Sequence, residues 1–130
     1  MTDRELVELA FTMLERSYSP YSHFPVGAAL EGADGAVYTG CNVENAAYGS
    51  CICAERTALV KAVSEGCQSF RRLAVVGGGE DYCWPCGSCR QMLYEFAPEL
   101  EILVARGDHD FVKTTLRELM PHGFGPEALA

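Results

Sequence analysis

The sequence predicts an α/β fold of three layers (α/β/α), in which a mixed sheet of about five strands lies between helices. Short apolar segments alternate with helical patterns along the chain, and a helix between two strands is typical of a parallel crossover. One pair of apolar segments is joined by the turn Gly32–Gly35, which is typical of an antiparallel hairpin. At 130 residues, the chain is expected to form a single domain, residues 1–130, around one core.

The first element is expected to be a helix over 3–16. Thr2 and Glu5 have the spacing of a capping box, and the apolar residues that follow recur at helical spacing. The aromatic and polar segment Ser19–Pro25 should end this helix, because serine and proline cluster there.

The other elements follow from apolar runs and helix signals. Four short apolar segments are expected to be strands, and a weaker fifth is expected last: 26–30, 37–42, 73–77, 101–105 and 111–115. Three further helical segments are expected: 53–65, 85–96 and 116–120. Gly66 is a typical C-terminal cap, and Pro85 suits the first turn of a helix. The tail, 121–130, should be mostly coil.

Composition limits the classes of partner. The formal net charge is −8, and such a surface repels phosphate backbones, so a small neutral substrate fits better than a nucleic acid. No apolar run reaches the ~18 residues that a membrane span needs, so no membrane partner is expected. The first residues are acidic where a signal peptide would be basic. We therefore expect a cytoplasmic protein.

The cysteines point to a metal rather than to disulfides. There are seven, an odd number, and a cytoplasmic chain rarely keeps a disulfide framework. Cys86 and Cys89 form a C-x-x-C at a helix start, which puts both sulfurs on one face. Cys53 begins another expected helix, and helix N-termini favour the thiolate. Three cysteines without metal-like spacing are interpreted as small buried residues: Cys41, Cys51 and Cys67.

Three thiolates suit a catalytic zinc site. Zinc prefers four ligands, and three protein ligands leave one position for water. Glu55 lies two residues after Cys53 and can take a proton from that water without binding the metal. Arg56 could donate to the ligand sulfurs and withdraw negative charge from the site.

Two motifs resemble those of the zinc-dependent nucleoside deaminases: C-A-E at 53–55 and P-C-G-S-C-R-Q at 85–91. The segments Asn42–Tyr48 and Phe24–Leu30 are similar to the short, homotetrameric cytidine deaminases. The resemblance runs from about Tyr18 to Leu129 and implies a cytidine-deaminase-like fold.

The resemblance also implies the chemistry. Cytidine or deoxycytidine plus water would give uridine or deoxyuridine plus ammonia, a reaction of pyrimidine salvage. Cys53, Cys86 and Cys89 would hold one Zn²⁺ per subunit. Glu55 would protonate N3 of the pyrimidine and then the leaving amine, against which the backbone of Ala54 would lie.

The substrate contacts that the resemblance implies come from both halves of the chain. Asn42 and Glu44 would hydrogen-bond the 3′-hydroxyl of the sugar, and they alternate on an extended segment so that both face one side. Phe24 would pack against the pyrimidine ring. Tyr48 and Phe124 would complete the site of a neighbouring subunit, so the enzyme would need its homotetramer.

One departure and three alternatives accompany this interpretation. Cys83-Trp84 stand before P-C-G where the family usually has small residues, so Trp84 could narrow the pocket or cover an interface. A deaminase of a cytosine antibiotic such as blasticidin S would share the zinc motif, but the Asn42/Glu44 pair favours nucleosides. A structural zinc or redox module using Cys86 and Cys89 would not need Glu55. A nucleic-acid-editing deaminase is disfavoured by the net charge of −8.

Overall fold

One mixed sheet forms the centre of the computed structural model, which describes residues 1–129. The strands in these residues are β1 (Val26–Gly32), β2 (Val37–Cys41), β3 (Phe70–Gly77), β4 (Glu101–Ala105) and β5 (Phe111–Thr115). Their order across the sheet is β2-β1-β3-β4-β5. Only β3 and β4 are parallel neighbours; the other adjacent pairs are antiparallel. The predicted mixed sheet of five strands is therefore confirmed.

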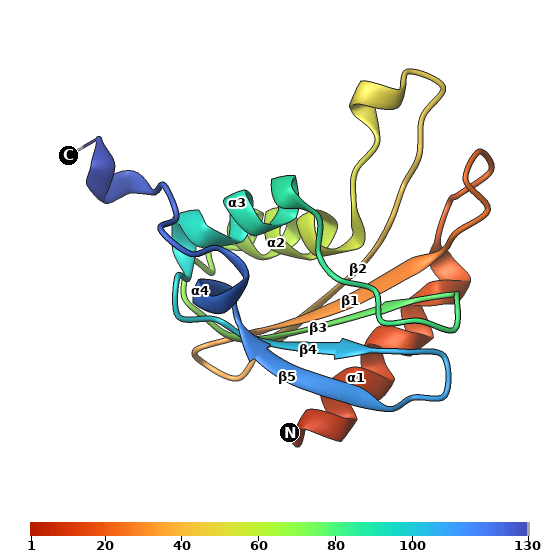
Figure 1. Ribbon diagram of the computed structural model, residues 1–130, viewed down its shortest axis with the longest axis horizontal. Helices are drawn as coiled ribbons and strands as arrows, with labels where there is room; N and C mark the ends of the chain where they lie inside the picture. The colour runs from red at the N-terminus through yellow and green to blue at the C-terminus, as the bar shows by residue number, and fades with distance from the viewer. Residues whose placement is uncertain (130) are drawn as a thin grey trace.

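Helices cover both faces of the sheet, which confirms the three layers. The α-helices of the described residues are α1 (Asp3–Thr12), α2 (Ala54–Ser64), α3 (Gly87–Phe96) and α4 (Leu116–Leu119). Three 3₁₀ turns add to them: η1 (Met13–Arg16), η2 (Tyr48–Ser50) and η3 (Pro126–Ala128). α1 lies on one face, and α2 and α3 lie together on the other (Figure 1).

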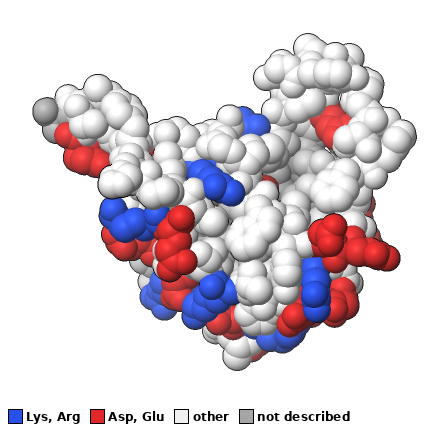
Figure 2. All heavy atoms as spheres, viewed as in Figure 1, with Lys and Arg blue, Asp and Glu red and all other residues white. Residues whose placement is uncertain are grey.

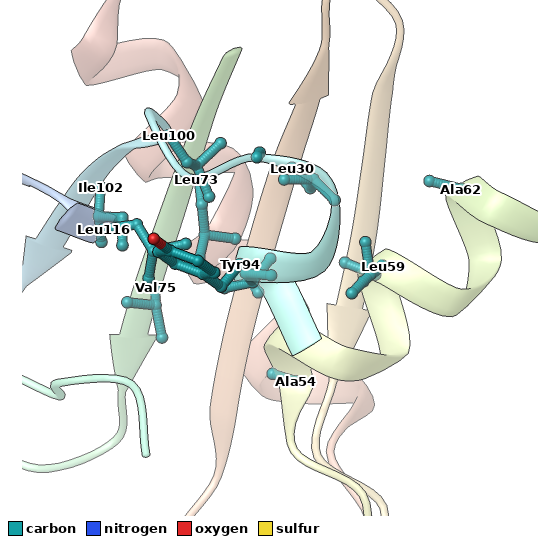
Figure 3. Packing of buried hydrophobic residues seen from close by; sticks show 14 of the residues in the cluster. Leu30, Ala54, Leu59, Ala62, Leu73, Val75, Tyr94, Leu100, Ile102 and Leu116 are labelled. Atoms are coloured by element: carbon teal, nitrogen blue, oxygen red, sulfur yellow. The ribbon is translucent and has the colours of Figure 1, made fainter. Parts of the chain in front are cut away.

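Side-chain alternation along the strands divides the core into two clusters. Successive residues of a strand point to opposite faces. Leu30, Leu73 and Ile102 point toward α2 and α3, where they pack with Leu59 (Figure 3). Their neighbours on the strands point toward α1, where Leu6 and Val7 cover them: Ala29, Ala74 and Leu103. The sheet is thus buried on both sides, and α2 and α3 are fixed on the same face.

Gly40 of β2 sets how closely α2 approaches the sheet. A Cβ at this position would lie 2.4 Å from the carbonyl oxygen of Ala54 and 2.6 Å from the nitrogen of Ala58. Any side chain would therefore push away the first turn of α2. The start of this helix, with Cys53 just before it, is held against the sheet.

Some predicted boundaries were wrong. The helix predicted over 85–96 begins at Gly87, because Cys86 is its N-cap with extended backbone (φ −70°, ψ 169°) and Pro85 belongs to the preceding loop. Cys53 likewise caps α2 rather than forming its first residue. The first helix is α-helical only to Thr12 and then tightens into η1.

Segments on two sides stand away from the body of the fold. The connection between β2 and α2, which contains η2, and the loop before β1 project on one side, and the C-terminal tail projects on the other (Figure 1). In Figure 2, charged side chains gather on the sides below, whereas the two projections and the hollow between them are mostly uncharged. No helix within residues 1–129 has the length and apolar character that crossing a bilayer requires.

Candidate active site

Three cysteine sulfurs meet where α2 and α3 begin. Cys53 and Cys86 are the N-caps of the two helices, and Cys89 lies in the first turn of α3. The Sγ atoms all lie within 4.8 Å of one another. Cys53 is 3.8 Å from Cys86, and Cys86 is 3.4 Å from Cys89. The positive ends of two helix dipoles therefore point at one group of sulfurs, as the sequence predicted.

The chemistry of this group fits a soft divalent cation. Zinc–sulfur bonds of about 2.3 Å in a tetrahedron place sulfurs roughly 3.8 Å apart, close to the separations seen here. Hydrogen bonds from Cys89 and Arg56 lower the pKa of Cys53 to about 5. The shared hydrogen bond and burial raise the pKa of Cys89. Ionisation of one thiol therefore disfavours ionisation of its neighbour. A bound cation would stabilise the thiolates and allow all three to be ionised.

Glu55 is a buried carboxyl beside the sulfurs. Only 3% of its surface is exposed. Burial raises the pKa of Glu55 to about 7, and the charge of Cys53 acts in the same direction. Its Oε1 has no hydrogen-bond partner among the residues that the structure describes. A carboxyl with such a pKa can both accept and donate a proton near neutrality.

Arg56 brings positive charge to the same sulfurs. Its Nη2 donates to the Sγ of Cys53 at 3.4 Å and to the carbonyl of Cys51 at 3.5 Å. The guanidinium is fixed by its position in the first turns of α2, directly after Glu55. It therefore offsets part of the negative charge of a thiolate at Cys53.

A cavity of about 240 Å³ opens beside the sulfurs. Cys53, Cys86 and Glu55 line it together with Asn42 and Glu44. A larger hollow of about 720 Å³ lies between loops 78–81 and 106–108. That hollow contains none of the clustered cysteines, so the smaller cavity is the candidate site.

Other residues of the cavity wall were not predicted as ligand contacts. Val26, Ile52, Cys51 and Cys83 line it, and Trp84 also contributes. Trp84 was predicted to narrow the pocket or cover an interface, and it lies in the cavity wall; the signal for it and for Cys83 was their position before the P-C-x-x-C. Apolar residues such as Ile52 carry no signal of their own.

The interpretation of three other cysteines as buried was wrong. Cys41, Cys51 and Cys67 are each half-buried. Cys51 lines the cavity because it lies in the segment between η2 and α2, which forms part of the cavity wall. Cys51, two residues before the cap residue Cys53, therefore lies in the wall of the site.

Four residues predicted to contact substrate lie outside the cavity wall. Phe24 packs its ring over Gly77 and Gly79, where a Cβ would lie about 3 Å away. Ala54 is fully buried. Tyr48 and Phe124 are 72% and 56% exposed, and they belong to the two projecting segments. The cavity wall of one chain therefore contains none of these four residues, although the contact predicted for Ala54 was through its backbone, which directly follows Cys53.

Comparisons with known proteins agree with this geometry. A family model described as the cytidine and deoxycytidylate deaminase zinc-binding region matches residues 1–104. The chain is 48% identical to the cytidine deaminase of Sporosarcina psychrophila over 89% of this chain and 86% of that protein. It is 43% identical to the cytidine deaminase of Halalkalibacterium halodurans over 96% of each. The crystal structure of cytidine deaminase from Burkholderia pseudomallei superimposes with a TM-score of 0.91 at 46% identity, covering 95% and 100%.

Proposed function

The chain belongs to the cytidine and deoxycytidylate deaminase family, and on this premise we propose that it hydrolyses cytidine and deoxycytidine. The products are uridine or deoxyuridine and ammonia. The observation that carries the proposal is the buried carboxyl of Glu55, which shares one cavity with Cys53 and Cys86. A purely structural metal site would have no use for an unpartnered, buried carboxyl oxygen.

The reaction needs an activated water, and the three sulfurs are suited to hold the ion that provides it. Cys53, Cys86 and Cys89 would hold a zinc ion, and such an ion would lower the pKa of a bound water to about 7 and so supply a nucleophile at neutral pH. Arg56 keeps positive charge next to the Cys53 sulfur. The positive charge of Arg56 therefore offsets part of the negative charge that three thiolates bring to the metal site.

Glu55 moves the protons of the reaction. Glu55 lines the cavity, and its Oε1 has no hydrogen-bond partner among residues 1–129, so the carboxylate can take a proton from the attacking water. It passes this proton to N3 of the pyrimidine. It then takes the second proton of the added water from the new hydroxyl on C4 and gives it to the amine, which leaves as ammonia when its bond to C4 breaks. Because burial raises the pKa of Glu55 to about 7, its carboxyl can both accept and donate a proton near neutral pH. Burial keeps bulk water from competing for the proton.

Asn42 and Glu44 bind the sugar in this proposal. Both line the cavity, and each offers polar atoms to a hydroxyl. The cavity of about 240 Å³ is smaller than the usual range for drug-sized ligands, which suits one nucleoside. Phe24, half exposed next to this wall, contacts the base, and the backbone of Ala54 faces its amino group.

We also propose a homotetramer in which neighbouring subunits complete each site. Tyr48 and Phe124 are large aromatic residues that lie exposed on segments projecting from the fold. Exposed aromatics of this kind are typical of contact surfaces. Mixing a Glu55→Ala chain with a Tyr48→Ala chain, each inactive alone, should restore part of the activity if the sites are shared.

The cytoplasm is the proposed compartment and pyrimidine salvage the proposed role. The metal site needs its cysteines as thiols, and the cytosol keeps thiols reduced. Deamination of free nucleosides returns cytosine-containing compounds to the uracil pool, which is a salvage reaction.

One assay tests the proposed function. The purified protein is incubated with cytidine, deoxycytidine, dCMP or blasticidin S, and ammonia release is followed with and without a zinc chelator. We expect release from both nucleosides, with loss in chelator. No release from either nucleoside would overturn the proposal, and release from blasticidin S alone would assign the antibiotic instead.

A further inference from the structure

One short segment, 17–26, holds both polar side chains that are proposed to bind the sugar. Asn42 is buried, and its Oδ1 accepts a hydrogen bond from the Val26 N–H at 2.9 Å. Its Nδ2 donates to the carbonyl of Phe24, also at 2.9 Å. The segment therefore fixes the amide of Asn42, and it fixes the carboxylate of Glu44 by a separate set of contacts.

Glu44 is held by residues 21 and 22. Its Oε1 accepts from the backbone N–H groups of Tyr21 and Ser22 at 3.0 and 3.1 Å. Its Oε2 accepts from the hydroxyl of Ser22 at 2.5 Å. A carboxylate has about four lone-pair positions, and three are occupied here. One acceptor position on Oε2 remains free for a ligand in the cavity that Glu44 lines.

The Ser22 hydroxyl is itself held in place. It accepts a hydrogen bond from the N–H of Phe24 at 3.1 Å. Between them, His23 has a left-handed backbone with φ of 57°, and its N–H donates to the carbonyl of Ser19 at 3.0 Å. Residues other than glycine seldom adopt this conformation unless their surroundings impose it. The turn therefore presents the Ser22 hydroxyl to Glu44 in one orientation.

We propose that Ser22 is a positioning residue, whose hydroxyl orients Glu44 so that Oε2 accepts a hydrogen bond from the 3′-hydroxyl of the nucleoside. This inference rests on the proposed function. Ser22 does not touch the substrate, but it sets the preference for sugars that carry a 3′-hydroxyl. Without its hydroxyl, Oε2 loses its hydrogen bond to the turn. The two N–H groups still hold Oε1, but they leave the direction of Oε2 less defined, because the terminal torsion is broad.

The test compares three substrates that differ in one hydroxyl. kcat and KM are measured for cytidine, 2′-deoxycytidine and 3′-deoxycytidine with the wild type and Ser22→Ala, both loaded with zinc. We expect Ser22→Ala to raise KM about tenfold for the first two, with kcat maintained, because a hydrogen bond to a charged group is lost. For 3′-deoxycytidine, kcat/KM should stay within about twofold, since it lacks the hydroxyl that Glu44 binds.

Two matched variants separate positioning from folding. Ser19→Ala removes a hydroxyl from the same turn. Among residues 1–129 this hydroxyl hydrogen-bonds only the Ser17 hydroxyl, at 3.2 Å, and not Glu44, so the variant should leave the preference unchanged. Ser22→Thr keeps the hydroxyl and should restore the wild-type KM. If Ser22→Ala does not fold, Ser22→Cys, a weaker donor of similar size, takes its place in the comparison.

The outcomes distinguish this proposal from the proposed function. A wild type that releases no ammonia from cytidine contradicts the function itself. A wild type that deaminates cytidine but does not prefer it to 3′-deoxycytidine overturns only the role of Ser22. An equal loss for all three substrates in Ser22→Ala overturns it as well, because it indicates a general effect on the fold.

Discussion

The Nη2 of Arg56 lies 3.4 Å from the Sγ of Cys53, so a guanidinium donates to one of three clustered sulfurs. The hydrogen bond raises the pKa of Arg56 and lowers that of Cys53. Both directions mean that the charged forms favour each other. Arg56 therefore reduces the negative charge of the sulfur cluster, although it does not line the neighbouring cavity.

The first prediction concerns this pair. Arg56→Ala should lower kcat for cytidine about tenfold or more while the zinc content stays near one per chain, because three thiolates bind the ion without it. Zinc is measured by elemental analysis on the same sample as turnover. Arg56→Lys, which keeps a charge, is the control and should retain more activity. Wild-type turnover in a fully metallated Arg56→Ala protein would show that the contact has no effect on the chemistry.

The second prediction concerns the metal. Cys89→Ser should lose most of its zinc, and with it the ability to release ammonia, because thiolate is the preferred ligand. Cys67→Ser is the control, since Cys67 is a half-buried cysteine that lies outside the cluster. It should bind zinc and turn over as the wild type does. Full zinc content in Cys89→Ser would remove Cys89 from the ligand set.

The third prediction uses the single tryptophan of the chain, Trp84. Trp84 lines the cavity and is 47% exposed, so a bound nucleoside should shield the indole and shift its fluorescence. Cytidine is titrated into Glu55→Gln, which prevents turnover during the measurement. We expect a saturable change in emission that is absent when Trp84→Phe is added. Binding by calorimetry without any change in emission would place the ligand elsewhere.

The fourth prediction follows from the burial of Glu55. Burial raises the pKa of Glu55 from 4.5 to about 7, so the folded state binds this proton more tightly than the unfolded state. Its stabilising effect is present below pH 4.5 and is lost as pH rises toward 7. Relative to Glu55→Gln, the metal-free wild type should lose about 3 kcal/mol of unfolding free energy across this window. Denaturant unfolding in chelator at several pH values measures it; parallel curves for the two proteins would contradict the raised pKa.

The sequence allowed the local parts of the site to be predicted. The C-x-x-C and the C-x-E each lie at the start of a helix. The directions of their side chains follow from a few neighbouring residues, because the cap positions of a helix have a defined geometry. The same holds for the hairpin of β1 and β2, whose turn is marked by Gly32 and Gly35. These features depend on contacts between residues that are near in sequence.

Features that depend on distant contacts could not be predicted in this way. Ser22 and Glu44 are 22 residues apart, and only the folded turn before β1 brings the hydroxyl to the carboxylate. The position of Phe24 over Gly77 likewise needs β1 and β3 to be neighbours. Proline is common in the first turn of a helix, so Pro85 was predicted to begin α3. In the structure Cys86 is the N-cap, and the helix begins one residue later, at Gly87.

The most direct test compares the wild type with Glu55→Gln, using cytidine as substrate and measuring zinc in both proteins. The account predicts that the wild type converts cytidine to uridine and ammonia. Glu55→Gln should keep its fold and its zinc but lose activity by about 10²-fold or more, because it cannot carry a proton. A zinc-loaded Glu55→Gln protein that deaminates cytidine at the wild-type rate would contradict the central claim.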